Sequence, residues 1–401
     1  MLSDLLSGVR VLDATNVLAG PLCTYLLALA GAEVVKVEIP ETGDFTRTVG
    51  PDPALNERKM GASFLAQNAG KRSITLNLKT EAGKDLFRRL ARTSDVVVEN
   101  FRPGVMRQLG LDHANLMTEN ERLVYCAISG FGQEGPLATR PAYDHIIQGL
   151  AGGMTISGDA SSGPMKAGFQ FCDTSAAMMA SYAITAALLR RERTGKGAFL
   201  DVAMLDTTLF TIGWAMGHFV VCGEAPKAMG NHNFTGCPSG TFRTAEGLIN
   251  IATNTQAQFV ALANVLGRSE WLRDDRFAVR EARLQHRDAM TELLESELAL
   301  KSAVAWEAVF EIAGVPAARV LSIPEIVAHE QIAVREFVHR FDHVAELDRP
   351  LCVPTAGFRI DGKAMRPASP PPVLGRDTDA VLKEAGLDDA DISRLRAEGA
   401  I

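Results

Sequence analysis

Short apolar runs and amphipathic segments alternate through the first third of the chain. The apolar runs are rich in Val, Ile and Leu and have the length of buried strands; they are residues 8–14, 33–38, 95–99 and 122–129. Residues 16–31 and 79–94 lie between these runs and repeat their apolar positions at helical spacing. Strands that alternate with helices predict an α/β fold with a mainly parallel sheet.

The pattern changes in the middle of the chain, where long helical tracts are predicted for residues 174–193 and 203–222. The second tract contains the longest apolar run, residues 209–221, which is too short to cross a bilayer. We therefore expect a buried helix at this run.

Residues beyond 225 form a block of different character. Residues 247–254 are predicted to be a strand, and residues 281–313 are helix-rich and charged. Strand-like residues then return at 317–323 and 353–360. The block 225–330 is therefore the candidate for a second, smaller domain.

Length and composition narrow the class of protein. A chain of 401 residues, 47% of them hydrophobic, is long enough for two domains with ordinary cores. The net charge of −7 argues against a broad nucleic-acid surface. The six cysteines are scattered without a C-x-x-C pair, and the first residues lack the basic start and apolar core of a signal peptide. We expect a cytoplasmic protein with neither a nucleic-acid nor a membrane partner.

Two short motifs give only weak support for a ligand site. GFGQEG (130–135) matches the dinucleotide pattern, but Pro136 and Pro141 favour an irregular loop over the helix that this pattern requires. HRFDH (339–343) places two histidines on one face of a strand, where a metal is possible in principle, yet surface histidines explain the pattern more simply. Neither NAD nor a metal is predicted.

Two basic segments indicate a nucleotide-like anionic ligand. AGKRSITLNLKT (69–80) has a basic glycine turn beside an alternating strand, a combination that can hold phosphates. ENFRPG (99–104) follows a predicted strand, at the edge where open α/β sheets bind ligands. Phe101 can stack on a base there, and Asn100 and Arg102 can contact polar groups.

A single acid stands among apolar and small residues in GFQFCDTSAAMMA (168–180). The residues after it, 174–193, are predicted to be a helix that ends at a TGKG segment. Asp173 thus occupies the position of a helix N-cap, which is a common and purely structural use of aspartate.

In this order, the segments resemble the class III coenzyme A transferases, the family of formyl-CoA transferase and carnitine CoA-transferase. The resemblance covers nearly the whole chain. It is carried by VLDATNVLAGPLCTYLLALAGAEVVKVE (11–38), GDFTR (43–47), KRSITLNLK (71–79), VVVENFRPG (96–104), SGFGQEGP (129–136), AYDHIIQG (142–149), FCDTSAAMMASYAITAALLRRERTGKG (171–197), DDRFAVREAR (274–283) and AGVPAARVLSIPE (313–325).

The resemblance implies a Rossmann-like large domain formed by both chain ends, residues 1–222 and 331–401, with a smaller α+β domain, 225–330, inserted between them. It also implies an interlocked homodimer whose two chains are threaded through each other. Asp173 would be the nucleophile that moves CoA from an acyl-CoA donor to a short carboxylic acid, in this family often a dicarboxylate. Backbone N–H groups at the helix start would favour its ionised form. No cofactor beyond CoA itself is expected.

The resemblance further implies which residues contact CoA. They are Leu18, Ala19, Leu76, Asn77, Leu78, Lys79, Asn100, Phe101, Arg102, Arg107, Tyr143 and Asp144. The chain departs from the family at Ile39, where some members carry a basic residue, and at Gln108, beside the displaced Arg107. We expect Lys71, Arg72 or Lys79 to compensate.

The acceptor pocket and two other functions stay open. Asn231 and His232 in GNHNFTGCPSGTF (230–242) are candidates for binding the acceptor acid, although a polar hinge loop explains them equally well. α-Methylacyl-CoA racemases share the fold but have a histidine where this chain has Tyr143, and His145 lies one position beyond Asp144. A CoA-binding protein without catalysis is the third possibility.

Overall fold

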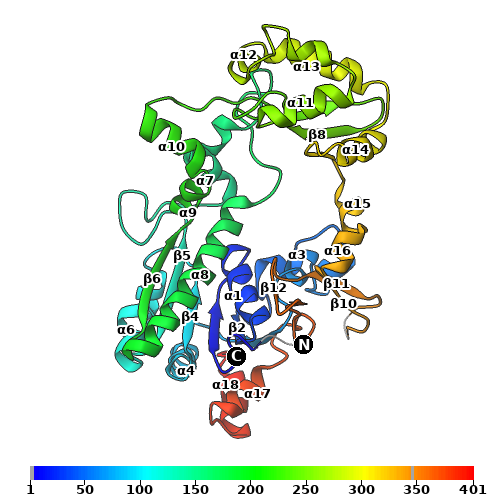
Figure 1. The fold of residues 1–401 in the computed structure, drawn as a ribbon. Coiled ribbons are helices and arrows are strands. Elements are labelled where there is room, and N and C mark those ends of the chain that lie inside the picture. Colours follow the sequence, from blue (N-terminus) through cyan, green and yellow to red (C-terminus); the bar gives the residue numbers. More distant parts are fainter. Residues whose placement is uncertain (1–3, 345–346) are drawn as a thin grey trace. The chain divides into compact units, whose positions relative to one another are not determined.

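A computed structural model describes residues 4–344 and 347–401 (Figure 1). The chain forms two compact units. The first contains residues up to 153 with 167–225 and 330–401, and the second contains 154–166 with 226–329. The predicted boundaries did not include the segment 154–166, which joins the second unit through a hydrogen bond from the Gly230 N–H to the Gly158 carbonyl.

The first unit is built on a six-stranded parallel sheet in the order β3-β2-β1-β4-β5-β6. Its strands are β1 (Arg10–Ala14), β2 (Glu33–Glu38), β3 (Lys71–Thr75), β4 (Val96–Glu99), β5 (Val124–Ser129) and β6 (Ala198–Ala203). The predicted α/β fold with a parallel sheet is confirmed. The strand order reverses between β1 and β4, so the loops after these two strands diverge and leave a crevice at the carboxyl edge.

Each central strand contributes side chains to two hydrophobic cores, one on each face of the sheet, because successive side chains point to opposite faces. Val11 packs into a core with α1 (Ala19–Leu29) and α8 (Phe171–Thr194), whereas Leu12 packs into a core with α4 (Glu81–Arg92). The sheet is therefore covered by helices on both faces, as parallel sheets require.

The end of the chain returns to the first unit. Helices α17 (Thr378–Glu384) and α18 (Asp389–Ala397) contribute to the same core as Leu12, and Figure 1 shows them in red beside the first strands. The hairpin of β10 (Val338–Phe341) and β11 (Leu351–Pro354) is held to α1 by a hydrogen bond of 2.6 Å from the Tyr25 hydroxyl to the Pro354 carbonyl.

Shorter elements complete the first unit. They are η1 (Phe45–Thr48), α2 (Pro53–Glu57), α3 (Ala62–Leu65), α5 (Val105–Leu109), α6 (His113–Glu119), α7 (Asp144–Leu150), α9 (Met204–Thr211), α10 (Gly213–Cys222), α16 (Glu330–Val334), β12 (Arg359–Ile360) and β13 (Lys363–Ala364); η2 (Gly153–Ile156) lies at the boundary.

The second unit has an antiparallel sheet in the order β7-β8-β9 and a helical core on one side of it. The strands are β7 (Ser239–Arg243), β8 (Leu248–Ala252) and β9 (Ala317–Arg319). The helices are α11 (Gln256–Val265), η3 (Ser269–Leu272), α12 (Arg280–Gln285), α13 (Arg287–Leu298), α14 (Ala303–Ile312) and α15 (Ile323–Val327).

The prediction of a buried helix at 209–221 is wrong. Helices α9 and α10 meet at a 77° bend, and no residue of α10 is buried in the single chain. Trp214 and Val221 are 73% and 81% exposed. Within the described ranges no single helix is long and apolar enough to span a membrane, and this bent pair is the one combination that passes by length and composition.

Candidate active site

The loops after β1 and β4 enclose a cavity of about 250 Å³ at the carboxyl edge of the sheet. We call it the Asp173 cavity. It is lined by Asn16, Val17, Leu18, Ala19, Asn100, Phe101, Arg102, Pro103, Ile128, Ser129, Gly130, Arg140, Pro141, Ala142, Tyr143, Asp173 and Met204. The fold thus brings together seven of the predicted site residues, namely Leu18, Ala19, Asn100, Phe101, Arg102, Tyr143 and Asp173.

Asp173 lies inside the first turn of α8, so the prediction that it caps this helix is wrong. The helix begins at Phe171, and its first N–H groups are capped by Asp144 instead. Asp144 Oδ2 accepts the N–H of Cys172 at 2.9 Å and that of Asp173 at 3.3 Å, while Oδ1 accepts the side-chain amide of Gln148. Asp144 is buried and lines neither cavity of this site.

Burial and, to a smaller extent, the neighbouring charge of Asp144 together raise the pKa of Asp173 to about 7. The expectation that backbone N–H groups favour its ionised form is therefore wrong, because those groups donate to Asp144. Asp173 is a half-buried carboxylate that ionises near neutral pH and has no base as a partner among the described residues. Perturbed acids of this kind concentrate at functional sites.

A second cavity, of about 1000 Å³, shares Asn16 and Phe101 with the first and extends it along the carboxyl ends of β2 and β3. We call it the long cavity. Besides Asn16 and Phe101, its lining includes the predicted residues Leu76, Asn77, Leu78 and Lys79, and the C-terminal residues Arg396, Gly399 and Ile401. The two cavities adjoin at Asn16 and Phe101. The rim of the long cavity carries two exposed cations, Lys79 and Arg396, and Arg396 also contacts Asp379 at 2.5 Å.

Of the three residues expected to compensate for Ile39, Lys71 and Arg72 are held by acids outside both cavities. Lys71 is 1% exposed, and its ammonium group contacts Asp13 at 3.1 Å. Arg72 points away to a pair with Glu384 at 2.7 Å. Lys79 is the one of the three that lines the long cavity.

Arg107 is exposed, lies 3.4 Å from Asp112 and lines neither cavity. Arg140 lines the Asp173 cavity and Arg396 lines the long cavity, and neither was predicted. The position of Arg140 immediately before the PAYD segment was an available signal. Arg396 had none, because only the folded C-terminus brings it to the cavity.

Asn231 and His232 lie in the second unit, on a cavity of about 820 Å³ whose lining belongs entirely to that unit. The His232 ring packs edge-on against Phe242, with ring centres 6.1 Å apart, and burial lowers its pKa. Its Nδ1 is buried and has no hydrogen-bond partner among the described residues.

The backbone shows the conformation of the two short motifs, GFGQEG (130–135) and HRFDH (339–343). The GFGQEG segment forms a loop without a helix, as Pro136 and Pro141 led us to expect. Strand β10 ends at Phe341, so His343 lies beyond it, and the described ranges contain no group of three or more His, Cys, Asp or Glu that could hold a metal.

Comparisons with known proteins agree with this geometry. The profile of CoA-transferase family III matches residues 6–378. The chain is 36% identical to a succinate–glutarate CoA-transferase from Agrobacterium fabrum, over 94% of this chain and 95% of that one. It is 37% identical to an acetyl-CoA:oxalate CoA-transferase from Acetobacter aceti, over 90% and 92%. A crystal structure of a CAIB/BAIF family protein from Brucella suis superposes with a TM-score of 0.84 at 34% identity, covering 96% of this chain and 100% of that one. The chain therefore belongs to CoA-transferase family III and is an enzyme of the class III CoA-transferases.

Proposed function

We propose that the enzyme transfers CoA from an acyl-CoA to a short dicarboxylic acid through covalent intermediates on Asp173. The Asp173 carboxylate attacks the thioester carbonyl, which forms a mixed anhydride and expels CoA thiolate. The thiolate attacks the aspartyl carbonyl of the anhydride, which gives an aspartyl-CoA thioester and releases the donor acid. The acceptor carboxylate repeats both steps in reverse and leaves as its CoA ester.

One observation carries this proposal: among the described residues Asp173 is a half-buried carboxylate without a basic partner, and the cavity that it lines adjoins the long cavity at Asn16 and Phe101. An ion pair with a cation would lower the pKa of the carboxylate and with it the nucleophilicity that this chemistry needs. The long cavity has the volume expected for a nucleotide-sized ligand, and Lys79 and Arg396 on its rim suit phosphate groups.

The acceptor class rests on two further observations. The named relatives act on succinate with glutarate and on oxalate. Arg102 and Arg140 line the Asp173 cavity and provide positive charge for the carboxylate of a diacid that does not react. The role of Asn231 and His232 in binding the acceptor stays a prediction.

Racemization is the less supported alternative. An acid–base pair is needed at the α-carbon. Asp144 already accepts backbone N–H groups of α8, and His145 is exposed and lies outside the lining of the Asp173 cavity.

We also propose that the enzyme is a homodimer, interlocked as in its family, with CoA as its only cofactor-like ligand. The apolar surface on α8, α9 and α10 supports a partner chain, because exposed patches of this kind mark interaction sites. Tyr182, Phe210 and Trp214 on these helices are each more than 70% exposed in the single chain.

An exchange assay tests the function. The enzyme is incubated with succinyl-CoA or acetyl-CoA and each of oxalate, glutarate, malate and mesaconate, and new CoA esters are separated by chromatography. We expect exchange with at least one diacid, and its loss in Asp173→Asn, which keeps affinity for CoA by calorimetry. Exchange of the α-proton with deuterated water, without any CoA transfer, would establish the racemase instead.

A further inference from the structure

The turn between β1 and α1 has an unusual backbone. Val17 has φ of 72°, in the left-handed region that β-branched residues avoid because the side chain crowds the following carbonyl. The next two residues, Leu18 and Ala19, lie on the wall of the Asp173 cavity. The conformation of this turn therefore determines where Leu18 and Ala19 lie in the wall of the cavity.

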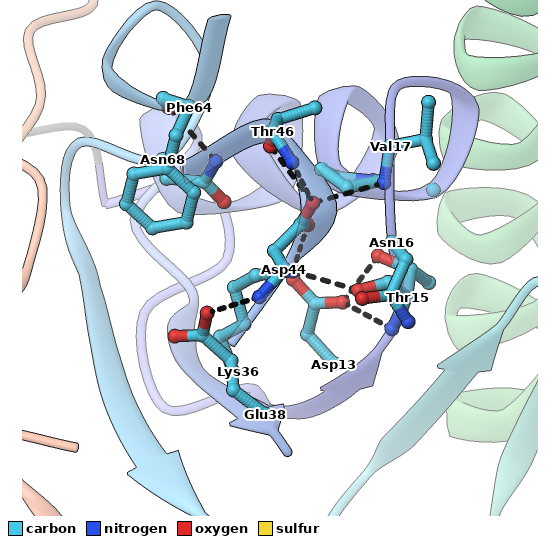
Figure 2. Close-up of polar contacts among 12 residues, drawn as sticks. Asp13, Thr15, Asn16, Val17, Lys36, Glu38, Asp44, Thr46, Phe64 and Asn68 are labelled. Atoms are coloured by element: carbon cyan, nitrogen blue, oxygen red, sulfur yellow. Dashed lines mark hydrogen bonds and ion pairs between the residues drawn. The ribbon is translucent and has the colours of Figure 1, made fainter. Parts of the chain in front are cut away.

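A buried ion pair forms hydrogen bonds with the backbone of this turn. Lys36 and Asp44 have no exposed side-chain surface, and the Lys36 Nζ lies 3.0 Å from Asp44 Oδ2. Lys36 Nζ also donates to the Thr15 carbonyl at 2.7 Å, and Asp44 Oδ1 accepts the Val17 N–H at 3.3 Å. Figure 2 shows Asp44 between Lys36 and the backbone of the turn. One ion pair thus holds peptide groups on both sides of Asn16.

Two amide side chains also form hydrogen bonds with the backbone of this turn. Asn100 accepts the Asn16 N–H at 2.8 Å and donates to the Asn16 carbonyl at 2.7 Å. Gln67 donates to the Val17 carbonyl at 2.6 Å. Three consecutive peptide groups are therefore fixed by side chains from four separate parts of the chain, which is how a strained backbone persists.

The ion pair is itself held in place by further buried charges. Glu38 accepts the Asp44 N–H at 3.0 Å and is bound by both Arg47 Nε and Nη2 at 2.7 Å. Although burial opposes ionisation of both groups, Lys36 lowers the pKa of Asp44, and Asp13 together with Asp44 raises that of Lys36. The pair stays charged across the neutral range.

We propose that Lys36 and Asp44 are positioning residues for CoA transfer. They hold the left-handed turn at Val17, so that Leu18 and Ala19 present a fixed wall to the acyl-CoA beside Asp173. This role rests on the proposed function. It predicts that the charge of Asp44 controls the rate of CoA transfer, although Asp44 neither lines the Asp173 cavity nor takes part in the reaction.

Asp44→Asn tests the role, with Asp95→Asn as the matched control. The asparagine retains the shape and the acceptor for Val17 but loses the ion pair. Asp95 also pairs with a buried base, Arg191 at 2.7 Å, and accepts a backbone N–H, but it precedes β4 at the opposite edge of the sheet. We expect Asp44→Asn to lower kcat/KM for the acyl-CoA about tenfold or more, since small misplacements near reacting atoms are costly. Asp95→Asn should stay within about twofold.

Two further readouts separate positioning from general damage. Hydrogen exchange of a peptide spanning residues 15–22 should accelerate in Asp44→Asn and not in Asp95→Asn. Glycine adopts positive φ freely, so the rate penalty of Asp44→Asn should be smaller in the Val17→Gly background.

Equal penalties in both backgrounds, or equal losses in the two asparagine variants, would overturn the positioning role and leave the proposed function standing. A wild-type enzyme that transfers no CoA to any diacid would overturn the proposed function and this role together. The exchange measurement would still report whether the turn is held.

Discussion

Asp173 and Asp13 are acids of the same unit whose pKa values shift in opposite directions. Burial and, to a smaller extent, Asp144 raise the pKa of Asp173 to about 7. Burial acts on Asp13 too, but Lys71, Lys36 and two threonine hydroxyls outweigh it and lower the pKa to about 2. An acid surrounded by bases is a structural element, whereas an acid placed beside another acid at a cavity is available for chemistry.

We expect the largest effect, a loss of folding stability, when the buried ion pair of Asp13 and Lys71 is broken. Lys71→Met removes the ammonium group that contacts Asp13 in the core, and we expect the free energy of unfolding to fall by about 3–5 kcal/mol in a denaturant titration. Arg72→Met, one residue along the same strand, removes a partly exposed pair with Glu384 and should cost at most about 1 kcal/mol. Equal losses would show that burial of the pair does not matter.

The two acids should also affect stability with opposite signs. The folded pKa of Asp173 lies above its unfolded value, so ionisation costs stability progressively as pH rises from about 4 to about 7. We expect the Tm of Asp173→Asn to exceed that of the wild type by a few degrees at pH 8, with the difference vanishing near pH 4. Asp13 has a lowered pKa and stabilises the fold above pH 4, so Asp13→Asn should lower Tm at pH 8. A lower Tm for both variants at pH 8 would contradict the raised pKa of Asp173.

The pH dependence of the rate reports the same acid. We expect kcat/KM to rise with pH up to about 7 and then to level off, because the ionised carboxylate is the nucleophile. Asp144→Asn removes the neighbouring charge and should move this rise to lower pH, while Asp95→Asn leaves it in place. An unmoved profile in Asp144→Asn would mean that burial alone sets the pKa.

The smallest effects should come from the rim of the long cavity. Lys79→Ala and Arg396→Ala should each raise KM for the acyl-CoA about three- to tenfold with little change in kcat, as expected for groups that bind without reacting. Arg107→Ala serves as the control, since Arg107 lines neither cavity. If Arg107→Ala had the larger effect on KM, the family resemblance would identify the CoA-binding residues better than the lining of the long cavity does.

Much of the sheet could be predicted because apolar runs such as 33–38 and 122–129 are short and bounded by loops. Strand β6 escaped prediction, since Asp201 interrupts its apolar pattern. Residues 209–221 gave the right helical composition and the wrong environment, because a hydrophobic pattern does not distinguish a core from a surface that the single chain leaves exposed.

The candidate site was predictable where consecutive residues carry it, as in Leu18–Ala19 and Asn100–Arg102. It was not predictable where distant segments meet. Asp144 caps α8 across an intervening loop, and Arg396 reaches the long cavity from the last helix. The buried position of Lys71 was equally hidden, since a basic turn looks the same in sequence whether it faces phosphate or an aspartate.

The most direct test of the covalent role of Asp173 is intact-protein mass spectrometry after incubation with succinyl-CoA, followed by peptide mapping. We expect an adduct with the mass of CoA less one water, located on the peptide that contains Asp173, converted by hydroxylamine and absent in Asp173→Asn. No adduct with any acyl-CoA donor, or one that maps to another residue, would contradict it.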